Sequence, residues 1–215
     1  MKKPTTNSMM HEEILRDYLR FWEHHDAEGA YRFLNKHFYV PALRFCMHWI
    51  SDEEDAKELV YDVLMRVWQK GDHLRKIRNL KVYIFVAVRN AALNFLQQQK
   101  KIHTLSWDEV DIRLSPLEPD PAQLLISSEM IGRIQDAIDK LPLKCKMVFK
   151  LIREEGFRNK DVAEILHISV NTIDNHLALA MRKISEAIHL YTQENTESSI
   201  QKATTRKKPD KNAES

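Results

Sequence analysis

Apolar side chains recur every three or four positions through most of this chain, the spacing that places them on one face of a helix. Neither half shows the strict alternation, bounded by Gly or Asn turns, that would indicate strands. The fold class predicted is therefore all-α. The expected helices begin near Ile14, cover 27–50 with a bend or break at Pro41, open at Ser51 or Asp52, cover 80–99 and 122–140, and continue as shorter helices from Pro142 to Tyr191.

The helical pattern breaks between 102 and 122, where three prolines and five acidic residues stand against one arginine. This composition is typical of a linker. We therefore expect two small helical domains, at 1–101 and 123–191, joined by an acidic, proline-containing linker at 102–122. The segment 192–215 is polar, carries both charge signs and contains only three apolar side chains, so we expect a disordered tail.

Composition excludes several classes of protein. Of the 215 residues, 43% are hydrophobic and 30% are charged, which suits a packed, water-soluble chain. The longest uninterrupted apolar run, 82–88, is far shorter than the about 20 residues that a membrane span needs. The amino-terminal residues lack the apolar stretch of a secretory signal. We expect no direct membrane insertion and a cytoplasmic location.

The sequence also lacks the residue motifs that are typical of catalytic and metal sites. The two cysteines, Cys46 and Cys145, lie far apart in apolar stretches, and the ten histidines form no metal-ligand spacing with carboxylates or cysteines. No glycine-rich phosphate loop or nucleophile elbow occurs. We therefore expect no catalytic residues, no metal and no cofactor.

Charge is almost balanced overall but is strongly sorted along the chain. The 33 basic and 31 acidic residues give a net charge of +2. Yet 51–62 holds six acids and only Lys57 as a base, whereas 75–101 holds seven bases and no acid. Neighbouring blocks of opposite sign suit two different partners.

The segment 159–177 has the pattern of a helix-turn-helix. Its two short apolar faces are Val162, Ile165 and Leu166, then Ile173 and Leu177. Only 167–169 separates them, which is room for a tight turn. His167 stands where glycine is usual, so we expect it to adopt a left-handed backbone, and Ser169 is expected to cap the second helix.

The outward residues at the start of that second helix have the chemistry to read base edges. Asparagine can pair with both edge groups of adenine, and threonine can hydrogen-bond or press its methyl on thymine. The candidate base readers are Val170, Asn171, Thr172, Asn175 and His176. The flanking cations that could neutralise phosphates are Arg158, Lys160, Arg182 and Lys183.

Taken together, these segments resemble the bacterial RNA polymerase sigma factors of the extracytoplasmic-function (ECF) type, in the sigma-70 family. Residues 141–149 with the helix-turn-helix look like their region 4, and residues 55–68 with 80–90 look like their region 2. The family commonly has Gln where this chain has Tyr61 and an aromatic residue where it has Leu64.

The resemblance implies that the chain binds core RNA polymerase, recognises the −10 and −35 promoter elements and directs transcription initiation. It also implies an anti-sigma factor as a further partner. Region 4 would bind the upstream element through the helix-turn-helix. Region 2 would bind polymerase through Asp55, Glu58, Asp62 and Arg66, and the downstream element through Arg78, Lys81, Arg89, Asn90 and Asn94. Phe85 is expected in the core.

Two other functions are compatible with parts of the pattern. A helix-turn-helix regulator of the response-regulator output type would share the second domain and bind duplex DNA without polymerase, but would leave the charge blocks of the first half unexplained. A helical adaptor would require the helix-turn-helix pattern to be a coincidence. The acidic linker, with Trp107, either runs toward the RNA exit path, as in the family, or is a solvated tether.

Overall fold

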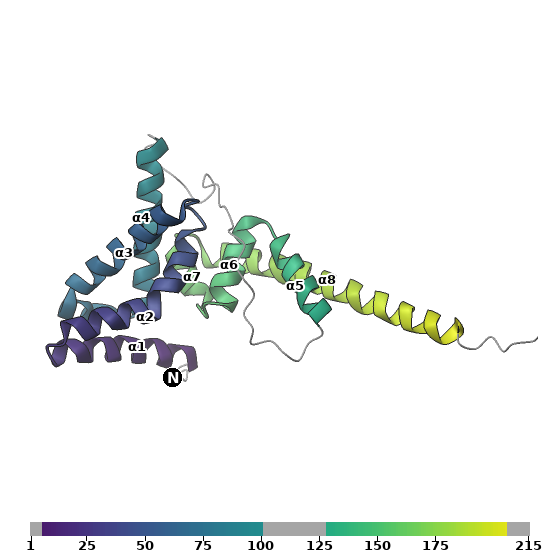
Figure 1. Ribbon diagram of the computed structural model, residues 1–215, viewed down its shortest axis with the longest axis horizontal. Coiled ribbons are helices and arrows are strands. Elements are labelled where there is room, and N and C mark those ends of the chain that lie inside the picture. The colour runs from purple at the N-terminus through teal and green to yellow at the C-terminus, as the bar shows by residue number, and fades with distance from the viewer. Residues whose placement is uncertain (1–5, 101–127, 206–215) are drawn as a thin grey trace, which may run out of the picture.

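Helices are the only regular secondary structure in the described residues of this protein, which confirms the all-α prediction. The structure, a computed structural model, describes residues 6–100 and 128–205 (Figure 1). The elements are α1 (Thr6–Glu23), α2 (Ala27–Cys46), α3 (Glu53–Gln69), the 3-10 helix η1 (Gly71–Lys76), α4 (Leu80–Lys100), α5 (Ser128–Asp139), α6 (Leu143–Arg153), α7 (Asn159–Leu166) and α8 (Val170–Thr205). The predicted linker at 102–122 lies outside the described residues.

Helices α1 to α4 pack into one bundle, drawn in purple to teal in Figure 1. The predicted cap of α3 is confirmed, because the Asp52 carboxylate accepts hydrogen bonds from the backbone N–H groups of Glu54 and Asp55, at 2.9 and 3.0 Å. At the other end of α3, the indole N–H of Trp68 donates to the Ala27 carbonyl, which joins α3 to the start of α2. Pro41 lies inside α2 and does not split it.

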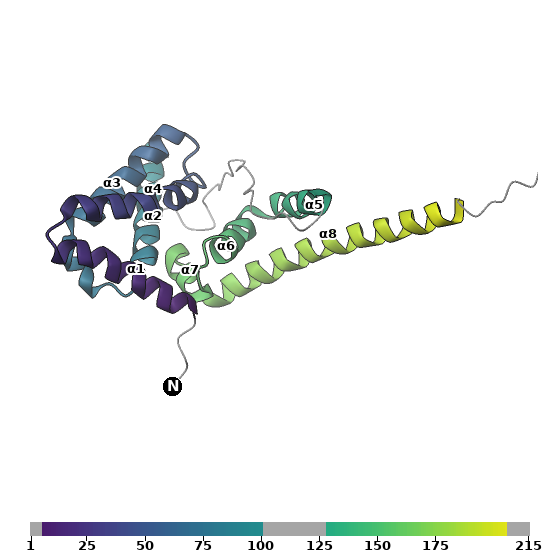
Figure 2. The ribbon, with the colours of Figure 1, turned by 60° about the horizontal axis from the view of Figure 1, so that its bottom comes forward.

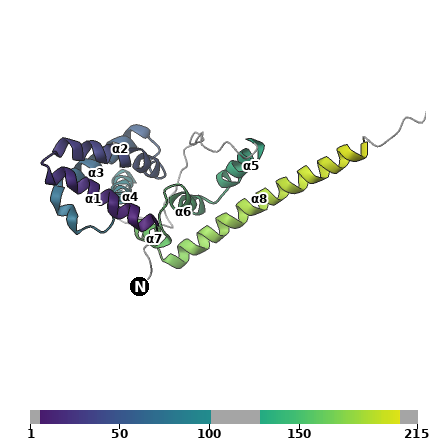
Figure 3. The same ribbon diagram turned by 90° about the horizontal axis from the view of Figure 1, so that it is seen from below.

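Helices α5 to α8 form the second half of the molecule. Helix α5 lies alongside α8, and a small apolar cluster joins α5, α6 and α8. Its buried members are Ile138, Leu141, Cys145, Ala180 and Ile184. The short helix α7 lies between this unit and the first bundle, beside α4, in all three ribbon views (Figures 1, 2 and 3).

Helix α8 is longer than the sequence predicts. It continues to Thr205 and extends away from the rest of the molecule as a single rod (Figures 2 and 3). The first part of the predicted disordered tail, 192–205, is therefore helical. Extending an existing helix requires no new nucleation, and the Gln, Glu, Lys and Ala residues of this segment are good helix formers. The rest of the tail lies outside the described residues.

The largest apolar core crosses the boundary between the two halves. Its buried side chains come from α2, α3 and α4, and also from α6, α7 and the first turn of α8. Phe85 of α4 is fully buried in it, as predicted, and Met147 of α6 belongs to the same cluster. The two predicted domains therefore pack against each other over a shared apolar surface.

Candidate nucleic-acid and polymerase interfaces

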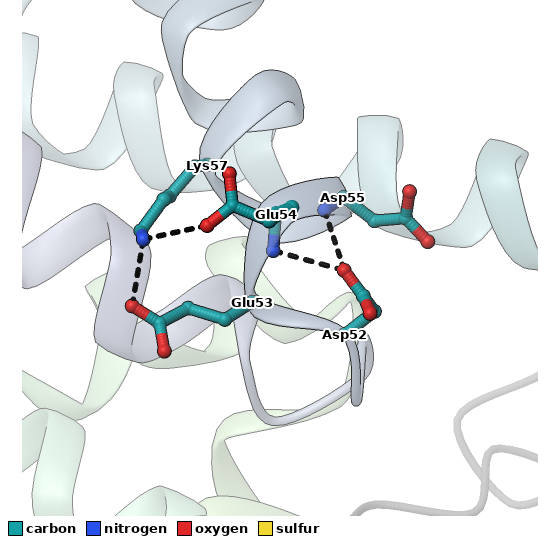
Figure 4. A network of polar contacts seen from close by, with 5 residues as sticks. All are labelled: Asp52, Glu53, Glu54, Asp55 and Lys57. Carbon is teal, nitrogen blue, oxygen red and sulfur yellow. Dashed lines mark hydrogen bonds and ion pairs between the residues drawn. The ribbon is translucent and has the colours of Figure 1, made fainter.

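The first turn of α3 concentrates acidic side chains at a positive helix end. Figure 4 shows Asp52 as the cap, with Lys57 between Glu53 and Glu54 at 2.9 Å from each carboxylate. The pKa of Lys57 is raised by its hydrogen bonds to Glu54 and Glu53. This one lysine thus offsets part of the charge of the first turn, while Asp55 points away from it (Figure 4).

The rest of the predicted polymerase-binding set follows along the outer side of α3. Glu58, Asp62 and Arg66 are exposed, and Asp55 is half-buried. Arg66 reaches Asp62 at 3.3 Å, with both side chains more than 60% exposed, so the pair is weak. Glu58 has no ion-pair partner among the described residues. The face is therefore acidic, solvated and open to an opposing basic surface.

An exposed aromatic side chain that the sequence analysis did not assign belongs to this face. Tyr61, one turn from Glu58 on α3, is 45% exposed and stacks on Tyr39 of α2 with ring centroids 4.7 Å apart. Val40 beside Tyr39 is 50% exposed. The signal was the departure at Tyr61 from the family's usual Gln, which replaces an amide by an aromatic surface.

The predicted downstream-element residues divide into two groups. Arg78, Asn90 and Asn94 are exposed, as a DNA-contacting role requires. Arg89 was expected on the outer face of α4 but is only 9% exposed, and burial lowers the pKa of its guanidinium. Lys81 is also turned inward, because it forms an ion pair with Glu155. A helical pattern identifies the outer side of an isolated helix, whereas here the turn that follows α6 packs against α4 at Lys81.

The predicted helix-turn-helix is present in detail. His167 ends α7 in the left-handed conformation, with φ 55° and ψ 43°, as its position predicts. The Ser169 hydroxyl accepts the N–H of Thr172 at 3.0 Å and so caps α8. The Asn159 side chain donates to Asp174 at 2.6 Å, which links α7 to α8 beside the turn.

The candidate base readers differ in how freely they are presented. Val170, Asn171 and Asn175 are exposed at the start of α8. The Thr172 hydroxyl lies 2.8 Å from that of Ser169, so part of its hydrogen-bonding capacity is used within the turn. The ring of His176 lies against α6, with Nδ1 3.3 Å from Cys145 Sγ, which corrects its assignment as a fully outward side chain.

The candidate phosphate-binding cations also differ in their exposure and in their ion pairs. Lys160 and Lys183 are exposed. Arg182 approaches Glu186 at 3.8 Å, an exposed pair that leaves it accessible. Arg158 is held within the fold, because its guanidinium donates two hydrogen bonds to the buried Asp161 carboxylate, at 2.8 and 3.2 Å. The Asp161 carboxylate also accepts a hydrogen bond from the Arg158 backbone N–H. These bonds raise the pKa of Arg158 and fix the start of α7.

The fold brings cations of the two halves to one cleft of about 670 Å³. Lys76 and Arg78 line it from the first half, and Arg158 and Lys160 line it from the second. The two sets are about 80 positions apart in sequence, so no local pattern could have predicted their proximity. Within the described residues, no group of three or more potential metal ligands occurs, and no helix has the length and apolar character of a membrane span.

Comparison with known proteins gives two family matches in the same order as the two halves. Residues 34–102 match "Sigma-70 region 2", and residues 131–184 match "Sigma-70, region 4". Among curated proteins, the chain is 20% identical over 172 residues to the ECF RNA polymerase sigma factor SigX of Bacillus subtilis, covering 78% of this chain and 88% of the relative. It is 24% identical over 165 residues to the ECF sigma factor RpoE of Cereibacter sphaeroides, covering 75% and 88%.

A solved structure is also similar to this chain. It contains the sigma factor RpoE in complex with the anti-sigma factor NepR from Bartonella quintana. The similarity has a TM-score of 0.45 and 27% sequence identity, and covers 70% of this chain and 92% of the other.

Proposed function

The chain belongs to the sigma-70 family of bacterial RNA polymerase sigma factors, in its ECF group, and on this premise we propose which of its surfaces contacts which target. As a sigma factor it acts with core RNA polymerase to recognise promoter DNA and start transcription. The region 2 match over 34–102 argues against the alternative of a response-regulator output protein, because such a protein would not contain that region.

The upstream element is assigned to the start of α8. The observation that carries this assignment is the His167 turn, which ends α7 and leaves Asn171 and Asn175 exposed at the amino-terminal end of the following helix. In a helix-turn-helix, this end of the second helix enters the major groove. Lys160, Arg182 and Lys183 would then neutralise phosphates on either side.

The polymerase contact is assigned to the outer side of α3. Glu58 and Asp62 are four apart, so their charges repel by a few tenths of a kcal/mol in the free chain. An opposing basic surface would offset that repulsion. Attraction between an acidic and a basic surface also raises the rate of association. Tyr61 lies between them and supplies the apolar area that such a charged contact needs at its centre.

The downstream element is assigned to the solvent side of α4 and of the loop that joins it to η1. Arg78, Asn90 and Asn94 are available in the structure described above, whereas Lys81 and Arg89 are not. Cations that follow the backbone and amides that reach the bases are the groups that bind single-stranded DNA. We assign no catalysis to the chain, place it in the cytoplasm with polymerase, and expect an anti-sigma factor as a further partner, to be identified by pull-down from native cells.

The test is to mix the purified chain with core polymerase and a library of promoter sequences, and to measure association and specific initiation. The expected result is a complex that starts transcription from a subset of the library. Tight binding to duplex DNA without any association with core polymerase would contradict the proposal.

A further inference from the structure

The cleft of about 670 Å³ at the start of α4 and of α7 is lined by more cations than carboxylates. Its four cations are Lys76, Arg78, Arg158 and Lys160, and its two carboxylates are those of Asp161 and Glu164. Arg158 and Asp161 form an ion pair with each other at 2.8 Å. The other three cations are exposed and have no ion-pair partner among the described residues. The cleft therefore has an excess of positive charge, which a bound anion would neutralise.

These cations come from two distant segments that border the same space. Lys76 and Arg78 precede α4, whereas Lys160 lies in the first turn of α7, and the two helices pack against each other (Figure 1). Single-stranded nucleic acid is bound by cations spread along its backbone. Cations of one sign that converge on a cleft instead focus their field on it and suit a compact anion, which they can contact from more than one side.

The cleft also lies at the amino-terminal ends of both helices. Asn79, Val82 and Tyr83 border it at the start of α4, and Arg158 and Lys160 border it at the start of α7. The first turn of α4 has no acidic residue, so no side-chain charge there opposes an anion. Amino-terminal helix ends carry partial positive charge and favour bound phosphate groups. The two helix ends thus add to the charge of the side chains.

Two polar groups of the cleft have hydrogen-bonding capacity that the described residues do not use. Asn79 Oδ1 accepts the N–H of Val82 at 3.2 Å, but Asn79 Nδ2 is buried and has no hydrogen-bond partner among the described residues. Buried donors are nearly always paired, so an acceptor is expected beside Asn79. The Tyr83 hydroxyl accepts a hydrogen bond from Lys70 Nζ at 2.6 Å and can still donate its own proton. Phosphate oxygens would supply the acceptors for both donors.

The size and the remaining lining of the cleft define the ligand further. A volume of about 670 Å³ lies within the range of small-molecule pockets. Three cations without partners match a chain of two or three phosphate groups better than a single phosphate, because the chain carries more negative charge. The apolar side chains of Ile77 and Val82 border the same space, so it can also accept an uncharged group attached to the phosphates.

We propose that this cleft is a binding site for a small anion with two or more phosphate groups, held by Lys76, Arg78 and Lys160 and by the Asn79 amide. The shared chemistry is a phosphate chain, either free or attached to a nucleoside. The site goes beyond the assignment of DNA-contacting surfaces and does not depend on it, although Arg78 and Lys160 belong to both. A bound phosphate chain would neutralise these two cations and so compete with DNA for them.

The test is isothermal titration calorimetry of the full-length chain with inorganic triphosphate and, separately, with ATP. A salt concentration of about 0.15 M screens most of the attraction between distant surface charges. We expect saturable one-to-one binding of triphosphate. Tighter binding of ATP would identify a nucleotide ligand, and equal affinities would limit the ligand to the phosphate chain, and both results support the site. Bound triphosphate should also slow amide hydrogen exchange at 76–83 and at 158–164.

Two variants and a matched control locate the binding. Lys76→Gln with Lys160→Gln removes one cation from each segment and should weaken triphosphate binding by about tenfold per cation, or about a hundredfold in all. The control, Lys36→Gln with Lys140→Gln, removes two exposed lysines outside the cleft and should change the affinity by less than about twofold. Asn79→Asp keeps an oxygen that can cap α4 but replaces the buried donor by a negatively charged acceptor, and should weaken binding by at least about tenfold. Circular dichroism checks that each variant keeps its helix content.

The results that would overturn the proposal are distinct from those that concern transcription. Absence of saturable triphosphate binding to the unmodified chain would overturn it, and so would equal weakening in the lysine variant and its control. Slower exchange at only one of the two segments would also contradict a site that both segments form. These measurements use neither polymerase nor promoter DNA, so failure of the chain to associate with core polymerase would count against the proposed function alone.

Discussion

Helices α3 and α4 pack against each other in the same bundle and carry opposite charges, yet they use those charges differently. On α3 the acids face water, and their ion pairs, Lys57 with Glu53 and Glu54 and Asp62 with Arg66, are local and exposed. On α4 the cations Lys81 and Arg89 are turned into the molecule. The two charge blocks are alike in sequence, but the basic block has lost two of its cations, Lys81 and Arg89, from the surface.

The difference shows what kind of surface each helix offers in the free chain. Exposed local pairs contribute little to stability, so the α3 face can exchange them for a partner's charges at little cost. A buried cation can be exposed only by disrupting the packing around it. The side of α3 that we propose for polymerase is therefore ready for contact, whereas Lys81 and Arg89 of the surface that we propose for DNA are not.

The largest expected effect is on polymerase association. Glu58→Lys with Asp62→Lys reverses two exposed charges of α3 and would oppose cations with cations, which costs several kcal/mol. We expect binding to core polymerase to weaken by at least about a thousandfold, or about 4 kcal/mol. Fluorescence-detected titration with core enzyme measures the loss, and circular dichroism checks that helix content is unchanged.

A matched control for this variant is Glu13→Lys with Glu28→Lys, which makes the same charge change at exposed positions of α1 and α2. This control should bind polymerase nearly as well as the unmodified chain. Equal loss in both variants would mean that net charge, not the α3 face, governs association.

Local sequence rules predicted those parts of the molecule that depend on short-range interactions. The Asp52 cap, the left-handed His167 and the Ser169 cap each follow from one residue and its immediate neighbours, and all three are present. The helical class followed from periodicity alone. Family resemblance added the presence of regions 2 and 4, and family models of these two regions match residues 34–102 and 131–184.

The errors occur where distant segments meet. Lys81 and Arg89 were placed on an outer face because periodicity describes one helix and not the segments that pack against it. Lys81 pairs with Glu155, 74 positions later, and Arg89 is buried. The ring of His176 faces α6 because Cys145, 31 positions earlier, lies beside it. The helical segment 192–205 was missed for another reason. Its polar composition shows that it cannot be buried, but composition does not show whether a segment extends a helix that has already formed.

The next prediction concerns the contact between the halves and its dependence on pH. His48, after α2, is 7% exposed and lies with Lys150 and Glu155 in the narrow space between α2 and α6. Burial, reinforced by Lys150 and Lys146, lowers its pKa to about 4, although its Nδ1 lies 2.7 Å from the Arg44 carbonyl. Between pH 6.5 and 4, His48 is therefore protonated in the unfolded chain but neutral in the folded chain.

Stability should accordingly fall as pH is lowered through this window, by about 3 kcal/mol in total. The measurement is urea unfolding at several pH values. His48→Gln should remove most of this slope, whereas His73→Gln, at an exposed position, should retain it. A slope that is the same in all three proteins would show that other groups determine the acid response.

A smaller effect is expected at the exposed end of α8. Asn171→Ala or Asn175→Ala should weaken recognition of the upstream element by about 1 to 3 kcal/mol if one base contact is lost. The free energy of unfolding should stay within about 0.5 kcal/mol, because both side chains are exposed. Ser185→Ala, also exposed on α8 but about three to four turns away, is the control. Unchanged promoter preference in both asparagine variants would remove them from the interface.

The smallest expected effect separates two cations that look equivalent in sequence, Lys160 and Arg158. Lys160 is exposed and has no ion-pair partner among the described residues, so Lys160→Ala should weaken binding to all duplex sequences alike and reduce the slope of log affinity against log salt by about 1. Arg158 is held by Asp161, so Arg158→Ala should instead lower the free energy of unfolding by about 1 to 3 kcal/mol, because the buried Asp161 carboxylate loses its partner. Salt titration and urea unfolding of both variants compare the two. An Arg158→Ala protein with undiminished stability and a reduced salt slope would mean that the pair with Asp161 opens on DNA, and that the arginine belongs with the exposed cations after all.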